Sequence, residues 1–274
     1  MKILIVDDDP EIHHQVRLML NDPSLTLESA GNFNDALVRL QSQPYDVVLT
    51  DIPGPDPDGF AFLDRIAAIR PQTKVLVMSA GNRRDRVAGS MRGRAASYVS
   101  KPFSAEQLKD ALTETLILRI EPDDIEVLSD KPNWITVRAP CKLEIAERLT
   151  RFFRELPSDL DQELRDGAAT AFRELFINAV EHGGQLDPEK KVELHFIRTN
   201  RSIVYYVRDP GQGFSMEDLP HAAISSPADP LNHVKVREEM GVRAGGFGLL
   251  LLNNFADELI YNEKGNEVIL IKRL

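Results

Sequence analysis

The first ten residues, MKILIVDDDP (1–10), place a short apolar run directly before three aspartates. Two similar runs follow at DVVLT (46–50) and KVLVMS (74–79). Helical patterns such as IHHQVRLML (12–20) and FAFLDRIAAIR (60–70) lie between or near these runs. Apolar runs of this length that alternate with helices indicate a parallel sheet covered on both faces. The N-terminal part is therefore predicted to be a doubly wound, flavodoxin-like α/β domain.

This first domain is predicted to span residues 1–120. A strand around Tyr98 precedes SAEQLKDALTETLILRI (104–120), which is typical of a helix with Ser104 as N-cap and Gln107 three residues later. The next stretch, EPDDIEVLSDKPN (121–133), has two prolines, five acidic residues and no sustained apolar period. That composition is typical of a linker.

A different pattern occupies residues 134–274. Runs of helices stand beside runs of strands, and the chain closes with a Gly-rich turn, a helix and a hairpin about Lys264-Gly265. The segments are WITVRAP (134–140), LEIAERLTRFFREL (143–156), DQELRDGAATAFRELFINAVEHG (161–183), KVELHFIR (191–198) and SIVYYVRD (202–209). Such runs predict an α+β two-layer sandwich.

Composition restricts the function. The 274 residues carry a net charge of -10 with a pI near 5.2, which argues against direct binding to nucleic acid. A single cysteine, Cys141, excludes an internal disulfide and a thiolate metal cluster, and is expected in a reducing compartment. The first apolar run is too short for a signal peptide or a membrane span, so we expect a cytoplasmic protein without membrane contact.

Acidic residues gather where two predicted strands end. Asp7 and Asp8 follow the first apolar run and Asp51 follows DVVLT, and ligands collect at the carboxyl ends of parallel strands. These carboxylates are predicted to bind Mg²⁺. Asp51 can accept a phosphoryl group if the metal and Lys101 neutralise the transferred oxygens, and Ser79 is predicted to hydrogen-bond that group. The alternative is that the aspartates only cap helices and stay solvated.

Residues 1–120 resemble the two-component receiver family in four motifs: VDDDP (6–10), DIPGPDPDG (51–59), MSA (78–80) and YVSKPF (98–103). The resemblance implies that Asp51 is the phosphoacceptor, and that the domain catalyses its own phosphorylation from a cognate sensor histidine kinase. It further implies that Pro53 lends its backbone carbonyl to the metal and that Tyr98 is a switch residue. It allows the Lys101-Pro102 bond to be cis.

A second set of polar and glycine residues lies in the C-terminal part. FRELFINAVEHG (172–183) is helical by period, so Glu174 and Asn178, four residues apart, project from one face. Two glycine motifs follow, in which glycine lets backbone N–H groups approach phosphates. They consist of Asp209, Gly211 and Gly213, then Gly246 and Gly248.

This ordered set resembles the GHKL ATPase superfamily over residues 134–274. The resemblance implies that Asn178 holds the Mg²⁺ of ATP, that Asp209 accepts a hydrogen bond from the adenine amino group, and that about 214–244 form an ATP lid. The glycines of both motifs line the nucleotide site. Glu174 is the candidate general base, or else its carboxylate only orients Asn178. The last hairpin, GNEVILI (265–271), lacks the Thr or Ser that many members place near adenine.

Among GHKL proteins, the pattern is most similar to the anti-sigma-factor serine kinases. A strand that ends in AP leads through two helices into ExxxNAxxH, and GNEVILIKRL (265–274) closes the chain. The segment before the ATPase carries no histidine, which disfavours a histidine kinase. The resemblance implies phosphoryl transfer from ATP to a serine or threonine of a STAS-type antagonist, with a sigma factor as a further partner, under control of the receiver. A homodimer is compatible with the sequence.

Two alternatives remain open at this point. In the first, ATP only sets the conformation of a surface that sequesters a partner, and no phosphoryl group reaches a protein. In the second, the receiver serves as a dimerisation platform without phosphorylation.

Overall fold

The computed structural model describes residues 1–52, 57–80, 87, 90, 95–117, 125–131, 133–157, 159–213 and 248–274. Contacts divide the chain into two compact units, Met1–Pro132 and Asn133–Leu274, called the first and second domains below. Within the described residues, no helix is long and apolar enough to cross a membrane.

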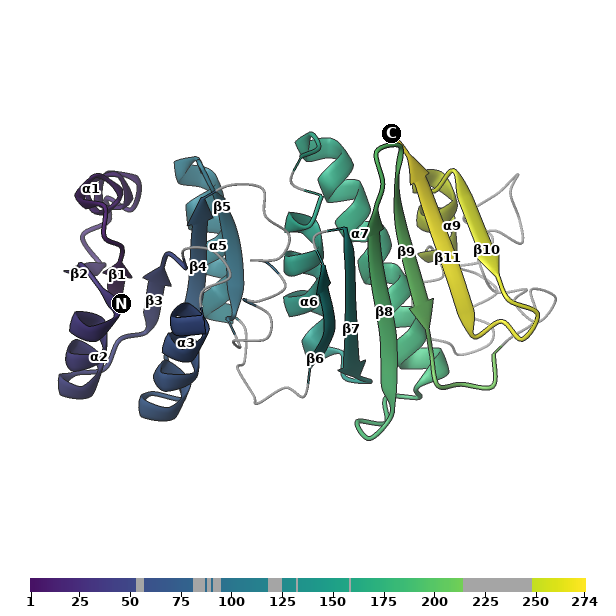
Figure 1. The fold of residues 1–274 in the computed structure, drawn as a ribbon, viewed down its shortest axis with the longest axis horizontal. Coiled ribbons are helices and arrows are strands. Elements are labelled where there is room, and N and C mark those ends of the chain that lie inside the picture. Colours follow the sequence, from purple (N-terminus) through teal and green to yellow (C-terminus); the bar gives the residue numbers. More distant parts are fainter. Residues whose placement is uncertain are drawn as a thin grey trace. The chain divides into compact units, whose positions relative to one another are not determined.

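The first domain is a five-stranded sheet with helices (Figure 1). Its elements are β1 (Lys2–Val6), α1 (Pro10–Met19), β2 (Thr26–Ala30), α2 (Phe33–Ser42), β3 (Val47–Thr50), α3 (Pro57–Ile69), β4 (Lys74–Ala80), β5 (Ser97–Lys101) and α5 (Ala105–Ile117). The strand order is β2-β1-β3-β4-β5 and every pair is parallel. Helix α1 packs beside α5, and α2 packs beside α3. The predicted doubly wound class is confirmed.

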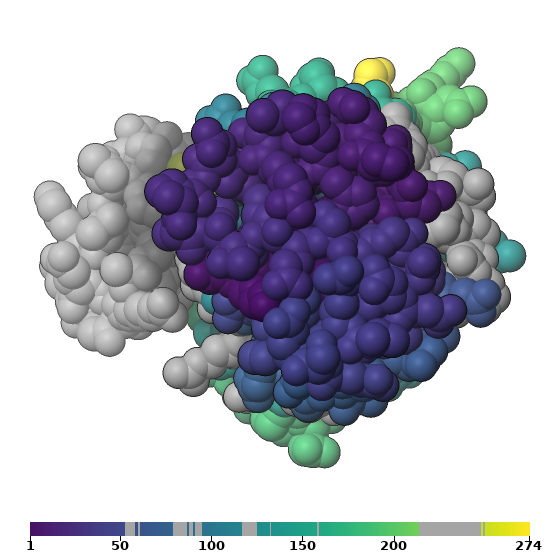
Figure 2. All heavy atoms as spheres, turned by 90° about the vertical axis from the view of Figure 1, so that its left-hand side faces the viewer, coloured from purple at the N-terminus to yellow at the C-terminus, as the bar shows by residue number. Residues whose placement is uncertain are grey.

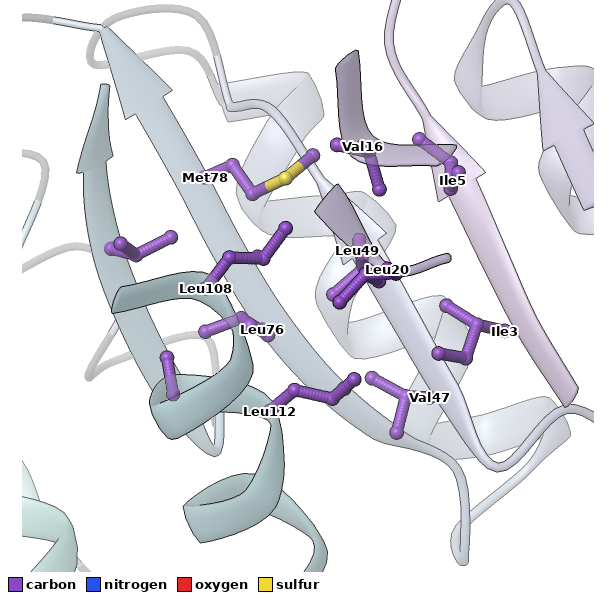
Figure 3. Close-up of a cluster of buried hydrophobic side chains, with 12 residues drawn as sticks. Ile3, Ile5, Val16, Leu20, Val47, Leu49, Leu76, Met78, Leu108 and Leu112 are labelled. Atoms are coloured by element: carbon purple, nitrogen blue, oxygen red, sulfur yellow. The ribbon is translucent and has the colours of Figure 1, made fainter. Parts of the chain in front are cut away.

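Apolar side chains on one face of this sheet form the core with α1 and α5 (Figure 3). Alternate residues of each strand point to the same face, so Ile3 and Ile5 of β1 share a layer with Leu49 of β3. Val16 of α1 and Leu108 of α5 close the layer from the helix side. Each fully buried side chain of this size stabilises the fold by about 2 kcal/mol.

Two helix caps anchor the domain locally. The Ser104 hydroxyl accepts a hydrogen bond from Gln107 N at 3.1 Å, and the Gln107 side chain accepts one from Ser104 N at 2.8 Å. This reciprocal capping box confirms the predicted start of α5. Asp9 caps α1 by accepting a hydrogen bond from Glu11 N.

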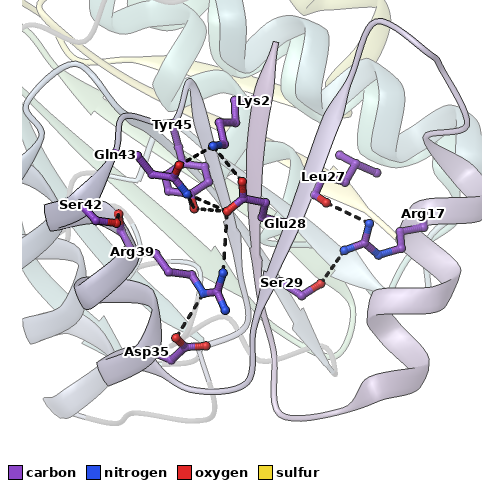
Figure 4. Close-up of polar contacts among 10 residues, drawn as sticks. All are labelled: Lys2, Arg17, Leu27, Glu28, Ser29, Asp35, Arg39, Ser42, Gln43 and Tyr45. Carbon is purple, nitrogen blue, oxygen red and sulfur yellow. Dashed lines mark hydrogen bonds and ion pairs between the residues drawn. The ribbon is translucent and has the colours of Figure 1, made fainter.

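Strand β2 is the edge of the sheet and has no apolar run, which is why its sequence, TLESA, did not predict a strand. A polar network holds it instead (Figure 4). Glu28 of β2 pairs with Lys2 of β1 at 2.8 Å and accepts the Tyr45 hydroxyl at 2.5 Å, and Gln43 donates to the same carboxylate. Residues up to about 50, purple to blue in Figure 2, make a continuous surface on this side of the first domain.

The segment 121–133, expected to be a linker, contains a strand, β6 (Glu126–Lys131). β6 forms the outer edge of the second sheet, and its residues are partly or fully exposed. An edge strand without a buried face has no apolar alternation, so sequence periodicity does not identify it. The segment expected to be a linker therefore includes a six-residue strand.

The second domain is a six-stranded sheet with helices packed on it, and β6 is counted with this sheet although it precedes the division at Pro132 (Figure 1). Its remaining elements are β7 (Trp134–Pro140), α6 (Glu144–Glu155), α7 (Gln162–Asn178), η1 (Ala179–Gly183), β8 (Lys191–Arg198), β9 (Ser202–Arg208), α9 (Gly248–Phe255), β10 (Glu258–Tyr261) and β11 (Glu267–Arg273). The strand order is β10-β11-β9-β8-β7-β6. The two-layer α+β class is confirmed.

Aromatic side chains join the two layers of this domain. Phe153 of α6 stacks on Phe172 of α7 with ring centroids 3.8 Å apart. Tyr205 of β9 and Phe196 of β8 are fully buried beneath them, because every second residue of these strands faces the helices. Helix α7 is thereby fixed on the sheet, and it carries two of the predicted site residues.

Candidate functional site

The ends of three strands bring two carboxylates and one ammonium group together in the first domain. Val6 and Thr50 are register partners in β1 and β3, so Asp7 and Asp51, the next residues, follow neighbouring strand ends. Lys101 ends β5. Its Nζ lies 2.7 Å from Asp7 Oδ2 and 3.0 Å from Asp51 Oδ2. The sequence analysis expected Asp7, Asp8 and Asp51 to meet at the strand ends, with Lys101 opposite the metal; the structure brings Asp7 and Asp51 together with Lys101.

The cluster is largely removed from water. The side chains of Asp7, Asp51 and Lys101 are 1%, 21% and 12% exposed. Asp7 Oδ1 also accepts a hydrogen bond from Asp9 N at 3.0 Å. Asp51 Oδ1 is buried and, among the described residues, has no hydrogen-bond partner. A buried carboxylate oxygen without a partner is costly, so this atom fits a bound cation such as Mg²⁺.

Other predicted residues of this site are placed differently. Asp8 is exposed at the start of the β1–α1 connection. Ser79 lies in β4 opposite Ser100 of β5, but its side chain, like the whole of Pro53, lies outside the described residues. In the part of the chain that the structure describes, no three His, Cys, Asp or Glu side chains are grouped as a metal site. Asp7 and Asp51 are the metal-ligand candidates that the structure brings together.

Three further features of the first domain bear on the acid cluster. Tyr98 of β5 is buried, with 3% of its surface exposed, and β4 lies between its strand and β3. The Lys101-Pro102 peptide bond is cis, as the motif allowed. His13 of α1 places Nε2 2.8 Å from the backbone oxygen of Asp7, a contact that the sequence gave no reason to expect. Adjacent histidines in a helix are most often ordinary surface residues, so nothing in the motif singled it out.

In the second domain, α7 presents Glu174 and Asn178 toward the start of α9. A Cβ atom added to Gly248, the first residue of α9, would lie 2.7 Å from Glu174 Oε2 and 3.6 Å from Asn178 Nδ2. Glycine therefore permits a close approach of the α9 backbone to both side chains. The N-terminus of a helix beside a carboxylate and an amide is a suitable place for a phosphate carried by a metal ion. Gly246 lies outside the described residues.

Burial raises the pKa of Glu174 above its usual range. The neighbouring Arg173 guanidinium, with Nη1 3.6 Å from Glu174 Oε1, opposes this by lowering the pKa, and Glu181 raises it further. Arg173 also pairs with Glu147 of α6, because its Nη2 and Nε atoms lie 2.8 and 3.0 Å from Glu147 Oε1. A carboxylate with a raised pKa accepts a proton more readily, which suits a general base.

Asp209 follows β9 and is fixed by its surroundings. Gly211 N donates to Asp209 Oδ1 at 2.7 Å, and Asp209 N donates to Asn266 O at 3.0 Å. Burial raises the pKa of Asp209, while the Gly211 hydrogen bond and, more weakly, Lys264 lower it. The carboxylate is half-buried, and the hydrogen bond to adenine that the resemblance implies for it stays a prediction.

Sequence reasoning missed Gly183 and Gly184, which complete this corner. A Cβ on Gly183 would lie 2.2 Å from Asp209 Oδ1, and one on Gly184 would lie 2.2 Å from Cys141 Sγ. Both close approaches result from the π-helical turn η1, in which Gly184 N donates a hydrogen bond to Ala179 O. Single π-helical turns are frequent at functional sites. The paired glycines directly after the ExxxNAxxH motif were the available signal.

Cys141 itself is fully buried beside this corner. Burial raises the pKa of its thiol to about 11, although Lys190 lowers it. A buried thiol with a raised pKa is unreactive.

We predict that Gly213→Ala destabilises the second domain by about 2 kcal/mol or more. Gly213 has a φ of 81°, and an added Cβ would lie 1.7 Å from Lys264 O. The chain has one tryptophan, Trp134 of β7, so its fluorescence during urea unfolding reports this domain. The matched control is Gln212→Ala, because Gln212 is the exposed neighbour in the same loop. Equal midpoints for both variants would refute the steric argument.

Comparison with known proteins follows the division of the fold. Residues 3–113 match the family model "Response regulator receiver domain", and residues 139–272 match "Histidine kinase-like ATPase domain". The response regulator protein PilR of Pseudomonas aeruginosa is 30% identical over 142 residues, which cover 50% of this chain and 32% of PilR.

Two further proteins are similar to part of this chain. The DNA-binding transcriptional regulator NtrC of Salmonella typhimurium is 33% identical over 156 residues, which cover 56% of this chain and 33% of NtrC. This chain thus spans about a third of the length of PilR and of NtrC. A solved response regulator receiver domain protein (CheY-like) from Methanospirillum hungatei JF-1 is 26% identical, with a TM-score of 0.39, and covers 42% of this chain and 92% of its own.

Proposed function

This chain joins a response regulator receiver domain to a histidine kinase-like ATPase domain, and we propose that phosphorylation of Asp51 in the first controls a protein serine/threonine kinase activity of the second. The observation that carries the proposal is the pairing of Lys101 with Asp7 and Asp51, which leaves Asp51 Oδ1 buried and unbonded. Phosphorylation of a receiver domain acts by changing the activity of another domain, and the ATPase domain is the candidate for that activity in this chain.

The receiver reaction begins with a phosphodonor, such as the phosphohistidine of a sensor histidine kinase. An Asp51 carboxylate oxygen attacks phosphorus, the bond from phosphorus to the donor breaks, and an acyl phosphate forms on Asp51. Lys101 neutralises charge on the transferred oxygens from one side. Mg²⁺, held by Asp7 and Asp51 and by the predicted ligands Asp8 and the Pro53 carbonyl, would neutralise it from the other. Ser79 would then hydrogen-bond the phosphoryl group.

The kinase reaction transfers the γ-phosphoryl group of ATP to a hydroxyl of a protein substrate. Glu174 accepts the hydroxyl proton, the new oxygen–phosphorus bond forms, and ADP leaves. Asn178 would hold the Mg²⁺ that accompanies ATP, and the metal would reduce the charge on the phosphates. Gly248 would admit the phosphates at the start of α9, the resemblance assigns Gly246 to the same role, and Asp209, Gly211 and Gly213 would form the adenine end. The closeness of the Gly248 backbone to Glu174 and Asn178, to whose side chains an added Cβ would lie within 2.7 and 3.6 Å, supports this assignment.

The preferred substrate is a STAS-type anti-sigma factor antagonist, and a sigma factor is the second partner. Support for this part comes from the ExxxNAxxH and GNEVILIKRL motifs. Phosphorylation of the antagonist would weaken the binding of the antagonist to this protein, and this protein would then be free to bind the sigma factor.

The test is incubation of the purified full chain with labelled ATP, Mg²⁺ and individual antagonist-domain proteins from its own genome. We expect acid-stable label on a serine or threonine of one antagonist, because phosphate esters survive acid whereas acyl phosphates and phosphohistidine do not. The same reaction without Mg²⁺ is the control. Binding of ATP without any transfer to an antagonist would favour a sequestering module and contradict the kinase assignment.

A further inference from the structure

The hairpin between β10 and β11 contains an unusual pair of asparagines. Asn262 Oδ1 accepts hydrogen bonds from Asn266 N at 3.0 Å and Glu267 N at 3.1 Å. Its Nδ2 donates to Asn266 Oδ1 at 3.0 Å. Gly265 N donates to Asn262 O, and Gly265 has a φ of 76°. The turn is therefore closed by side-chain as well as backbone hydrogen bonds, and Asn266 is 8% exposed.

This hairpin is attached directly to Asp209. Asn266 O accepts the hydrogen bond from Asp209 N at 3.0 Å, and Asn266 Nδ2 lies 3.4 Å from Asp209 O. A second contact joins the residues two positions away, because Lys264 Nζ donates a hydrogen bond to Gly211 O at 3.1 Å. Both backbone groups of Asp209 thus meet Asn266, while the Asp209 side chain meets Gly211.

The orientation of the Asp209 carboxylate decides which base fits. Oδ1 is occupied by Gly211 N, and among the described residues Oδ2 has no hydrogen-bond partner. A carboxylate oxygen accepts a hydrogen bond from the amino group of adenine, but it repels the carbonyl oxygen that guanine carries at the same position. A site built to hydrogen-bond one group rejects an analogue that lacks it, provided that the group is held in place.

We propose that Asn262 and Asn266 form a side-chain clasp that fixes Asp209 and thereby sets the preference of the site for adenine over guanine nucleotides. The inference rests on the proposed nucleotide binding by the second domain. The side-chain contact that reaches Asp209 is the one from Asn266 Nδ2 to Asp209 O, and Asn262 holds Asn266 in place. Both asparagines are positioning residues, because they act through Asp209.

The experiment measures the dissociation constants of ADP and GDP, each with Mg²⁺, by titration calorimetry on the full chain. The diphosphates avoid turnover during the titration. We expect the ratio of ADP to GDP affinity to fall about five- to tenfold in Asn266→Ala and in Asn262→Ala. The double variant should lose little more than either single variant, because Asn262 holds Asn266 and Asn266 in turn holds the backbone of Asp209, so the two side chains act in series on one residue. The affinity for GDP should stay nearly constant.

The matched control is Glu263→Ala, because Glu263 is an exposed residue of the same turn. It should leave the ratio unchanged. A merely structural role for the asparagines would lower the urea midpoint of Trp134 fluorescence and reduce both affinities alike, without a change in the ratio, and that result would overturn the clasp. If Asn266→Ala does not fold, Asn262→Ser, which keeps one acceptor, decides the question by the same ratio.

Failure of the premise is distinguishable from failure of the inference. If the unaltered protein binds neither ADP nor GDP, the proposed nucleotide site is wrong and the clasp falls with it. If the unaltered protein prefers ADP and both asparagine variants keep that preference, nucleotide binding stands and the clasp is refuted.

Discussion

Replacing Asp51 with asparagine is expected to abolish labelling of the first domain by a phosphodonor, a loss of at least about 100-fold in rate. An amide oxygen is a poor nucleophile and cannot form the acyl phosphate, although it fills the same space beside Lys101. The fold should survive, because Asp51 N keeps its hydrogen bond to Val6 O. The measurement is incorporation of phosphate from labelled acetyl phosphate with Mg²⁺, followed by treatment with hydroxylamine, which cleaves acyl phosphates.

Asp64→Asn is the matched control for this experiment. Asp64 is an exposed aspartate of α3, so the substitution makes the same chemical change away from the strand ends. It should retain full labelling. Equal, hydroxylamine-sensitive labelling of Asp51→Asn and the unaltered protein would place the acceptor elsewhere. No labelling of the unaltered protein would leave the receiver as a dimerisation platform.

Glu174→Gln is expected to lower the rate of phosphoryl transfer to the antagonist by about 10²- to 10⁴-fold while ATP binding changes little. Glutamine keeps the size of the side chain and its place beside Gly248, but it cannot take the proton of the attacking hydroxyl. The measurement is the initial rate of transfer at saturating ATP, together with the ATP dissociation constant. Loss of kcat without loss of affinity identifies a group that acts in the chemical step.

Glu163→Gln provides the control on the same helix, because Glu163 is an exposed residue in the first turn of α7. It should leave both the rate and the affinity unchanged. If Glu174→Gln transfers phosphate as fast as the unaltered protein, Glu174 only orients Asn178. If regulation of the partner is unchanged in the variant while ATP stays bound, the ATPase half acts by sequestering its partner.

Much of the fold follows from periodicity. The buried strands β1, β3 and β4 are continuous apolar runs, and parallel strand ends meet at one edge, so the convergence of Asp7 and Asp51 with Lys101 could be predicted. Helical spacing likewise predicted that Glu174 and Asn178 share a face. These predictions succeed because they depend on local pattern and on one general property of parallel sheets.

The parts that escaped prediction depend on position in the sheet or on non-local pairing. β2 and β6 are edge strands without a buried apolar face, so their sequences carry no strand period. The attachment of Asp209 to Asn266 requires β9 and β11 to be neighbours, although 57 residues separate the two side chains. The close approach of Gly183 to Asp209 depends on the π-helical turn η1; the paired glycines of the sequence marked its place but not its geometry.

The most direct test of control by the receiver is the rate of label transfer from ATP to the antagonist with and without beryllofluoride, a mimic of the phosphoryl group on Asp51. The proposed function predicts that beryllofluoride with Mg²⁺ changes this rate in the unaltered protein and has no effect in Asp51→Asn. An unchanged rate in the unaltered protein, with beryllofluoride binding confirmed by its fluorine NMR signal, would contradict coupling between the two domains.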